Sequence, residues 1–196
     1  MNRTAQRKIA QGLYVAVSLC VGLWIGTRPH LGLGIKMAMA FVLLIPGRIN
    51  SFLYRDLYTS LRAFNREDHD GAHVAATRFV DDLRRHPWKQ RVRLGWSGIY
   101  SNDLASLGFN NIGAADLHCG RAEAAERALR TSIEHDPLNP LPYFNLAVLE
   151  SLRDAPDKSD EFRRRAFELG YSGSTGDAIV QQVHAIYARL EGRKAA

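Results

Sequence analysis

Apolar residues are concentrated near the start of the chain in two long runs. The first run, residues 9–27, contains no charged side chain, and it would form about 28 Å of helix, close to the roughly 30 Å core of a bilayer. The second run, residues 31–47, contains one charge, Lys36, whose aliphatic stem can carry the ammonium back toward the headgroups. Because Pro29 stops the first helix, the pattern predicts a transmembrane helical hairpin within residues 1–48.

Other arrangements of these runs stay open. The first run also fits a buried core helix or a cleaved signal peptide, although no small-x-small cleavage site follows it. The second run also fits a helix that lies in the membrane interface or packs under the domain, which leaves a single span. The number of spans decides the compartment of everything after residue 48.

Charge is distributed as unevenly as hydropathy. Residues 1–47 hold five of the 26 basic residues and no acid, so they contribute +5 of the net +6 and the later residues contribute +1. The nearly neutral later part argues against nucleic-acid binding, and the excess charge beside apolar runs favours a lipid bilayer as partner. Basic residues before the first run and after the second place both ends of a two-span hairpin in the cytoplasm, and we expect a bacterial inner membrane.

Small residues at four-residue spacing offer a way for the two hairpin helices to pack. The pairs are Gly12 and Ala16, Gly22 and Gly26, and Gly34 and Ala38. Beyond the hairpin, apolar residues at helical spacing predict a further helix over residues 49–65. This helix would also graze the lipid surface, with Tyr54, Tyr58 and its arginines, Arg55 and Arg62, at headgroup level.

Residues 106–139 carry the most specific pattern in the chain. A first helix contains Phe109-x2-Ile112-Gly113, and a second contains Ala125-x3-Leu129. Gly120 makes the turn between these helices, and Pro137 ends the second. The pattern resembles a tetratricopeptide repeat (TPR), a helix–turn–helix unit of about 34 residues. Gly113 and Ala125 would let the two helices approach closely, whereas Asp116 stands where the repeat has tyrosine.

Weaker copies flank this unit. Residues 140–173 contain Tyr143-x2-Leu146-Ala147, 34 residues after the matching positions, with Glu150 in place of the tyrosine. Residues 54–87 keep Ala75-x3-Phe79 and Pro87, and residues 88–105 form an insertion that we interpret as an extra or distorted helix.

Residues 175–190 have one apolar stripe and predict a capping helix. Together with the repeats they give an all-α fold, in which the hairpin precedes a short TPR-like α-solenoid over residues 49–196. An irregular helical bundle is the alternative, and it is also all-α.

No stretch predicts catalysis. His69 and His73 share a polar turn without the further ligands that a metal needs. His118 and Cys119 are adjacent and point about 100° apart, without a third group to orient them. Cys20 and Cys119 are interpreted as free thiols, and Arg163–Arg165 as a solvated helix face. We therefore expect a non-enzyme with no metal, cofactor or small-molecule substrate.

The resemblance implies a concave groove along the first helices of the repeats, which in this family commonly holds a peptide or a partner helix. The groove residues it implies are Asn111, Ala114, His118, Asn145 and Val148. Asn111 and Asn145 are 34 residues apart and would occupy equivalent sites. The predicted function is a membrane-anchored adaptor or scaffold for a protein partner. The alternative is an accessory structural subunit of a larger membrane complex.

Overall fold

The computed structural model describes residues 3–27, 32–92, 100–101, 103–172, 181, 183–185 and 187–188. These residues are helices and connecting turns, without a strand, so the predicted all-α class is confirmed. The α-helices are α1 (Arg3–Gly26), α2 (Leu33–Leu53), α3 (Arg55–Phe64), α4 (His69–Arg85), α5 (Leu104–His118), α6 (Ala122–His135), α7 (Pro140–Leu152) and α8 (Pro156–Glu168), and a 3-10 helix, η1 (Pro87–Gln90), follows α4.

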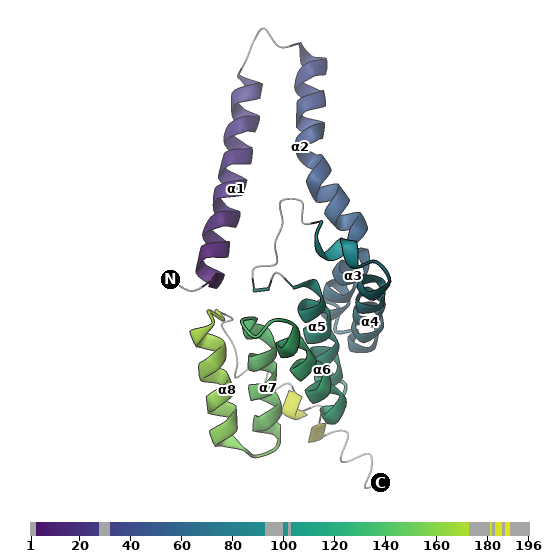
Figure 1. Cartoon of the computed structure of the whole chain (residues 1–196), viewed down its shortest axis with the longest axis vertical. Helices are drawn as coiled ribbons and strands as arrows, with labels where there is room; N and C mark the ends of the chain where they lie inside the picture. The colour runs from purple at the N-terminus through teal and green to yellow at the C-terminus, as the bar shows by residue number, and fades with distance from the viewer. Residues whose placement is uncertain are drawn as a thin grey trace.

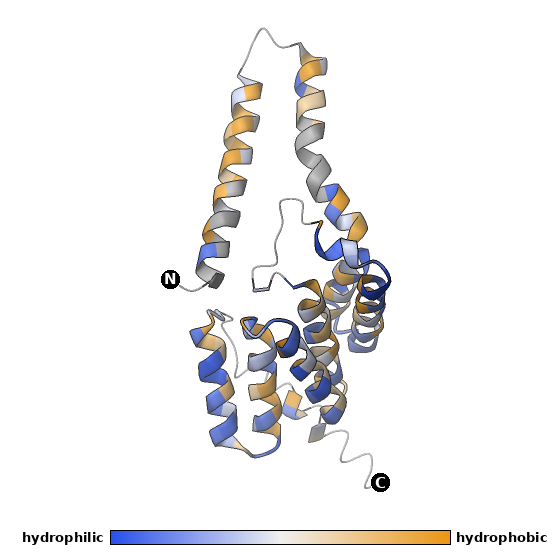
Figure 2. Cartoon of the chain, viewed as in Figure 1, coloured by the Kyte–Doolittle hydropathy of each residue, from blue (hydrophilic) through white to orange (hydrophobic). Residues whose placement is uncertain are grey.

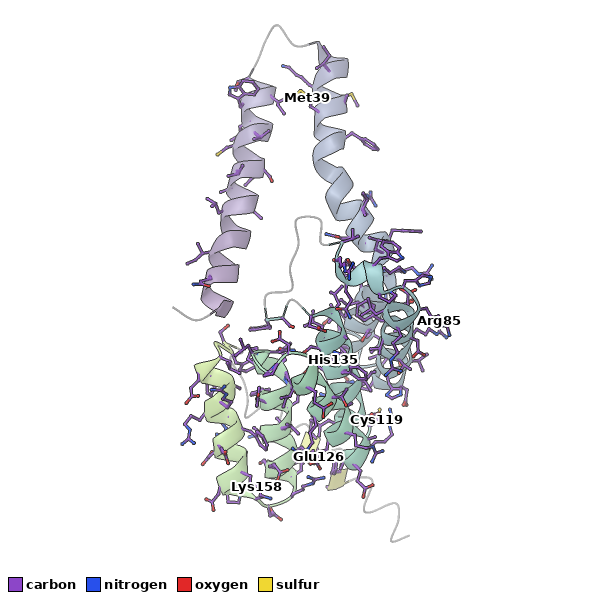
Figure 3. All side chains as sticks on the ribbon, viewed as in Figure 1. Met39, Arg85, Cys119, Glu126, His135 and Lys158 are labelled. Atoms are coloured by element: carbon purple, nitrogen blue, oxygen red, sulfur yellow. The ribbon has the colours of Figure 1, made fainter. Side chains whose placement is uncertain are left out.

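Helices α1 and α2 form an antiparallel pair that stands apart from the other helices (Figure 1). The pair is closest at its upper end, where Met39 lies between the two helices (Figure 3), and it widens toward the domain. At that upper end Lys36 Nζ donates a hydrogen bond to the backbone oxygen of Gly26, at 3.0 Å. A cation at the C-terminus of a helix is favourable, so Lys36 stabilises the hairpin by capping α1.

The packing predicted for this hairpin is wrong in one respect. A Cβ atom built on Gly12, Gly22, Gly26 or Gly34 would meet no other atom within 4 Å, so these glycines do not seat one helix on the other. The helices also extend beyond the apolar runs, since α1 begins at Arg3 and α2 continues to Leu53. Within the described residues, no helix is long and apolar enough to cross a membrane. The transmembrane part of the prediction is therefore not confirmed.

The remaining helices stack as three antiparallel pairs, α3 with α4, α5 with α6, and α7 with α8. The second helix of each pair contacts the first helix of the next, and α5 also contacts both α3 and α7. Figure 1 shows this stack as the lower part of the molecule. Helices α5 and α6 cover the range of the copy at residues 106–139, although α5 begins earlier, at Leu104. Helices α7 and α8 lie within residues 140–173, and α3 and α4 occupy the range of the upstream copy.

Helix α5 is the centre of the stack because small residues let it approach both neighbours. A Cβ on Gly113 would lie 2.6 Å from Leu129 Cγ on α6, and a Cβ on Gly108 would lie 2.6 Å from Val80 Cγ2 on α4. Leu129 is fully buried, as is Ala125. The spatial reason given for Gly113 and Ala125 is therefore confirmed, whereas the repeat pattern assigned no role to Gly108.

Other signature residues also have structural roles. Leu146 and Ala147 are buried on α7, and Gly120 adopts a positive φ of 75° in the α5–α6 turn. Pro137 directly follows Asp136, the C-cap residue of α6. Phe109 stacks on the His135 ring at 5.3 Å. Ile112 and Tyr143 are half-buried.

Two buried acids explain the missing tyrosines. Asp116, 2% exposed, accepts a 2.7 Å hydrogen bond from Arg121 Nε. Glu150, 5% exposed, lies 3.1 Å from Arg153, which also bridges to Glu126 on α6 at 2.7 Å. An ion pair thus replaces the aromatic ring at the same position of both repeats.

The helix predicted over residues 49–65 is broken at Tyr54, which lies between α2 and α3. Tyr54 is 2% exposed, and its hydroxyl donates to the backbone oxygens of Lys89, at 2.9 Å, and Val92. The placement of Tyr54 at headgroup level is therefore wrong, because this side chain is buried and binds the segment after α4. Tyr58 is half-buried.

The insertion and the capping helix are described in part. The insertion begins with η1 rather than a full helix, and residues 93–99 and 102 lie outside the described residues. The described residues between 181 and 188 are helical, Val183 is fully buried, and Tyr187 packs against the same core.

Candidate functional site

The five predicted groove residues lie on α5 and α7, the first helices of adjacent pairs. Ala114, His118 and Asn145 are half-buried, whereas Asn111 is 8% exposed and Val148 is 1% exposed. Since α5 contacts α7, the structure brings these residues to neighbouring helices, but their exposure is unequal.

Asparagine side chains connect the two helices. Asn145 Nδ2 donates to Asn110 Oδ1 at 3.0 Å, and Asn110 Nδ2 lies 3.5 Å from Asn111 Oδ1. The equivalent asparagines of the two repeats are thus linked through Asn110, a residue that the sequence argument did not select. The sequence feature that could have pointed to Asn110 is the adjacent pair Asn110-Asn111. Consecutive amide side chains on one helix point in different directions and can each bond a different neighbouring helix.

We call Asn145, Asn110 and Asn111 the asparagine ladder. Its Asn111 end has a hydrogen-bond donor that is not used. Asn111 Nδ2 is buried and has no hydrogen-bond partner among the described residues. Leaving a buried donor unpaired costs about 1–3 kcal/mol. Because Nδ2 is buried, a backbone carbonyl of a bound segment would recover that cost only if the Asn111 side chain turned toward the surface.

Val148 belongs to the apolar core rather than to an open surface. It clusters with Leu117 on α5 and Val183 near the C-terminus, and Tyr187 packs against the same cluster. The two C-terminal side chains therefore share the core on which the α7 end of the predicted groove is built.

Two histidines that the sequence analysis assigned to different features, His69 and His118, meet between α4 and α5. The rings of His69 and His118 stack at 4.3 Å with a 17° interplanar angle, and Phe64 lies near both rings. Burial, with a smaller contribution from the charge of His69, lowers the pKa of His118 to about 4. His73 Nδ1 lies 2.9 Å from Asp116 Oδ1, outside hydrogen-bond geometry. No local feature of the sequence marked the contact between His69 and His118, which arises because the start of α4 packs beside the end of α5.

An ion-pair network surrounds the histidine pair. Arg121 bonds both Asp116 and Asp70, the latter at 2.8 Å. The Arg121 hydrogen bond holds the pKa of Asp70 below its usual range. The Cys119 thiol donates to Asp70 at 3.5 Å, and burial raises the pKa of Cys119 to about 11. This thiol stays protonated at neutral pH and is therefore a poor nucleophile.

Over the part of the chain that the structure describes, no group of three or more His, Cys, Asp or Glu side chains is arranged to hold a metal. On α8, Arg163 pairs with Asp160 and Arg165 with Glu168, while Arg164 is exposed. Arg163 also borders a cleft of about 440 Å³ whose other lining residues are Ser151, Asp154, Pro156, Ser159, Asp160 and His184.

Comparison of the chain with protein-family models, curated proteins and solved structures finds no match. The functional argument therefore depends on the residues and contacts described above.

Proposed function

We propose that the chain is a membrane-anchored adaptor or scaffold of the TPR type. Helices α1 and α2 hold it to a bilayer, and the stack from α3 to α8 binds a protein or peptide partner. The bilayer is a bacterial inner membrane and the stack faces the cytoplasm.

The exposed apolar surface of α1 and α2 is the observation that carries the proposal. Leu13, Leu19 and Leu23 on α1 are 64%, 64% and 70% exposed, and Leu33 and Phe41 on α2 are 75% and 69% exposed. Figure 2 shows apolar residues along both helices where they stand clear of the domain. A surface of this extent is costly in water and marks contact with a membrane or with another protein.

Helices with apolar residues on more than one side suit lipid better than a single partner groove. Leu13 and Leu19 are six residues apart on α1, so they face different sides of the helix. The open space around the four hairpin glycines agrees with a pair of helices that lipid surrounds.

The partner-binding part of the proposal is supported by the asparagine ladder. Asn111 on α5 and Asn145 on α7 are 34 residues apart, and the Asn111 amide nitrogen has no hydrogen-bond partner among the described residues. Amide side chains can pair with the backbone of an extended or helical segment independently of its sequence. A pair of such sites on adjacent helices fits a bound peptide.

The anchor is tested with the full chain and neutral phosphatidylcholine vesicles. We expect the chain to float with the vesicles and to resist extraction by carbonate. A chain that stays at the bottom of the gradient would refute the anchor. A topology reporter fused after Ala196 should report the cytoplasm, and a signal from the opposite side would refute the two-span arrangement.

Partner binding is tested by a detergent pull-down with mass spectrometry, comparing wild type with Asn145→Ala. We expect the variant to recover about five- to thirtyfold less of a specific partner, since a hydrogen-bond site contributes on the order of 1–2 kcal/mol. Arg164→Ala, on the exposed side of α8, is the matched control and should retain the partner. Equal recovery with all three proteins would contradict the groove assignment.

A second function, an accessory structural subunit of a larger membrane complex, is favoured by one observation. The α7 end of the groove shares its core with Val183 and Tyr187, whereas the hairpin glycines have open space beside them. On this alternative, other membrane helices pack on the glycines. The variant Gly22→Leu/Gly34→Leu would then lose the co-purifying membrane subunits, while Asn145→Ala would retain them.

A further inference from the structure

The break between α2 and α3 gathers cationic and aromatic side chains at the base of the hairpin. Arg48 and Phe52 are four residues apart on α2 and share a face. Phe52 is 81% exposed, and the Arg55 side chain, just past the break, is 76% exposed. A ring and two guanidinium groups therefore project from the point where the apolar helix enters the domain.

The segment after α4 adds two more side chains to this region. The Tyr54 hydroxyl bonds the backbone of Lys89 and Val92, which fixes η1 and the residues after it against the α2–α3 junction. Trp88, within η1, is 50% exposed, and Arg91, directly after it, is exposed. We call Arg48, Phe52, Arg55, Trp88 and Arg91 the basal belt.

The charge of the belt is only partly neutralised. Asp56 lies 3.9 Å from Arg55, and Lys89 is paired with Asp82. Among the described residues, no carboxylate lies within ion-pair distance of Arg48 or Arg91. Two exposed cations thus remain beside two exposed aromatic rings.

We propose that the basal belt binds the headgroups of anionic phospholipids. This inference rests on the proposed membrane anchor and adds the lipid class to it. The belt lies on the same helix as the exposed Leu33 and Phe41, and Ile49 is exposed next to Arg48. Figure 2 shows mixed polar and apolar residues at the lower end of this helix. Arginine and tryptophan are suited to this depth, because arginine pairs with phosphate and tryptophan prefers the interface. A surface beside the bilayer with excess positive charge selects anionic over zwitterionic lipid.

The test reconstitutes the full chain in nanodiscs of phosphatidylcholine with about 30% phosphatidylglycerol, on the order of a bacterial anionic fraction. Lipids that stay with the protein are counted by native mass spectrometry. We expect phosphatidylglycerol to be enriched at least about twofold over the disc composition, and the enrichment to disappear in high salt. The variant Arg48→Gln/Arg55→Gln/Arg91→Gln should return the ratio to that of the disc.

The matched control is Arg163→Gln/Arg164→Gln/Arg165→Gln, which removes the same charge from α8. It should retain the wild-type enrichment. Enrichment that survives in the belt variant, or that falls equally in the α8 variant, would overturn the belt. Vesicle flotation distinguishes a failure of the proposed lipid preference from a failure of the proposed membrane anchor. A chain that floats with neutral vesicles but shows no lipid preference refutes only the belt, and a chain that floats with neither neutral nor anionic vesicles refutes both.

Discussion

Lowering the pH from 7 to 5 should destabilise the helical stack through His118. Its pKa is about 4 in the folded protein, below the ordinary histidine value of 6.5 that the unfolded chain has, so folding favours the neutral ring. A group whose pKa is lowered on folding in this way takes up its proton more readily in the unfolded chain. Its stabilising contribution is therefore complete above about pH 6.5 and is lost as the pH falls toward 4.

The magnitude follows from the linkage relation. A shift from 6.5 to about 4 corresponds to about 2 kcal/mol lost between pH 7 and pH 5 if it acts at full strength. His118 is only half-buried, so solvent screening reduces the expected loss to about 1 kcal/mol. The pKa values of Asp70, Asp82 and Glu126 are lowered by their basic partners, and those carboxylates lose their contribution at lower pH than this window.

The assay is urea unfolding of the full chain in detergent at pH 7 and pH 5, followed by circular dichroism. The variant His118→Phe keeps a ring against His69 and Phe64 but does not titrate, so its loss should fall below about 0.5 kcal/mol. His184→Gln, at an exposed position, should retain the wild-type loss. An equal pH dependence in wild type and His118→Phe would refute the reasoning.

Three further outcomes are expected from unfolding and exchange measurements on the same protein. Asn139→Ala should cost about 2 kcal/mol, because the buried amide caps α7 through Leu141 N and bonds Ser106 Oγ at 2.9 Å. Asn139→Ser should recover about half of that, and a loss below about 0.5 kcal/mol for the alanine variant would count against the buried network. Gly113→Ala should cost about 1–2 kcal/mol by collision with Leu129, whereas Gly22→Ala should cost nothing, and equal effects would contradict the packing. Lys36→Met should increase hydrogen exchange at the end of α1, and unchanged exchange there would show that the cap contributes little.

The candidate site was predictable only in outline. The spacing of Asn111 and Asn145 placed both on corresponding positions of neighbouring helices, since local periodicity fixes which face of a helix a residue occupies. It could not show that Asn110 connects them or that Val148 is buried. Those properties depend on which helices pack together and at what distance.

The histidine pair shows the same limit of the sequence argument, because here a contact formed that the sequence did not predict. His69 and His118 are separated by 49 residues, and neither has a local feature that favours the other. Their rings stack only because α4 and α5 pack with the start of one beside the end of the other. The sequence alone therefore suggested an isolated polar turn.

The sequence by itself determined the helices, their order and the close contact at Gly113. Helical hydrogen bonds are local, and apolar periodicity marks the buried side of each helix. Tertiary structure decided the break at Tyr54, the bridges from Arg121 to Asp70 and from Arg153 to Glu126, and the open space beside the hairpin glycines. Each of these depends on atoms distant in sequence, whose approach is set by packing rather than by local spacing.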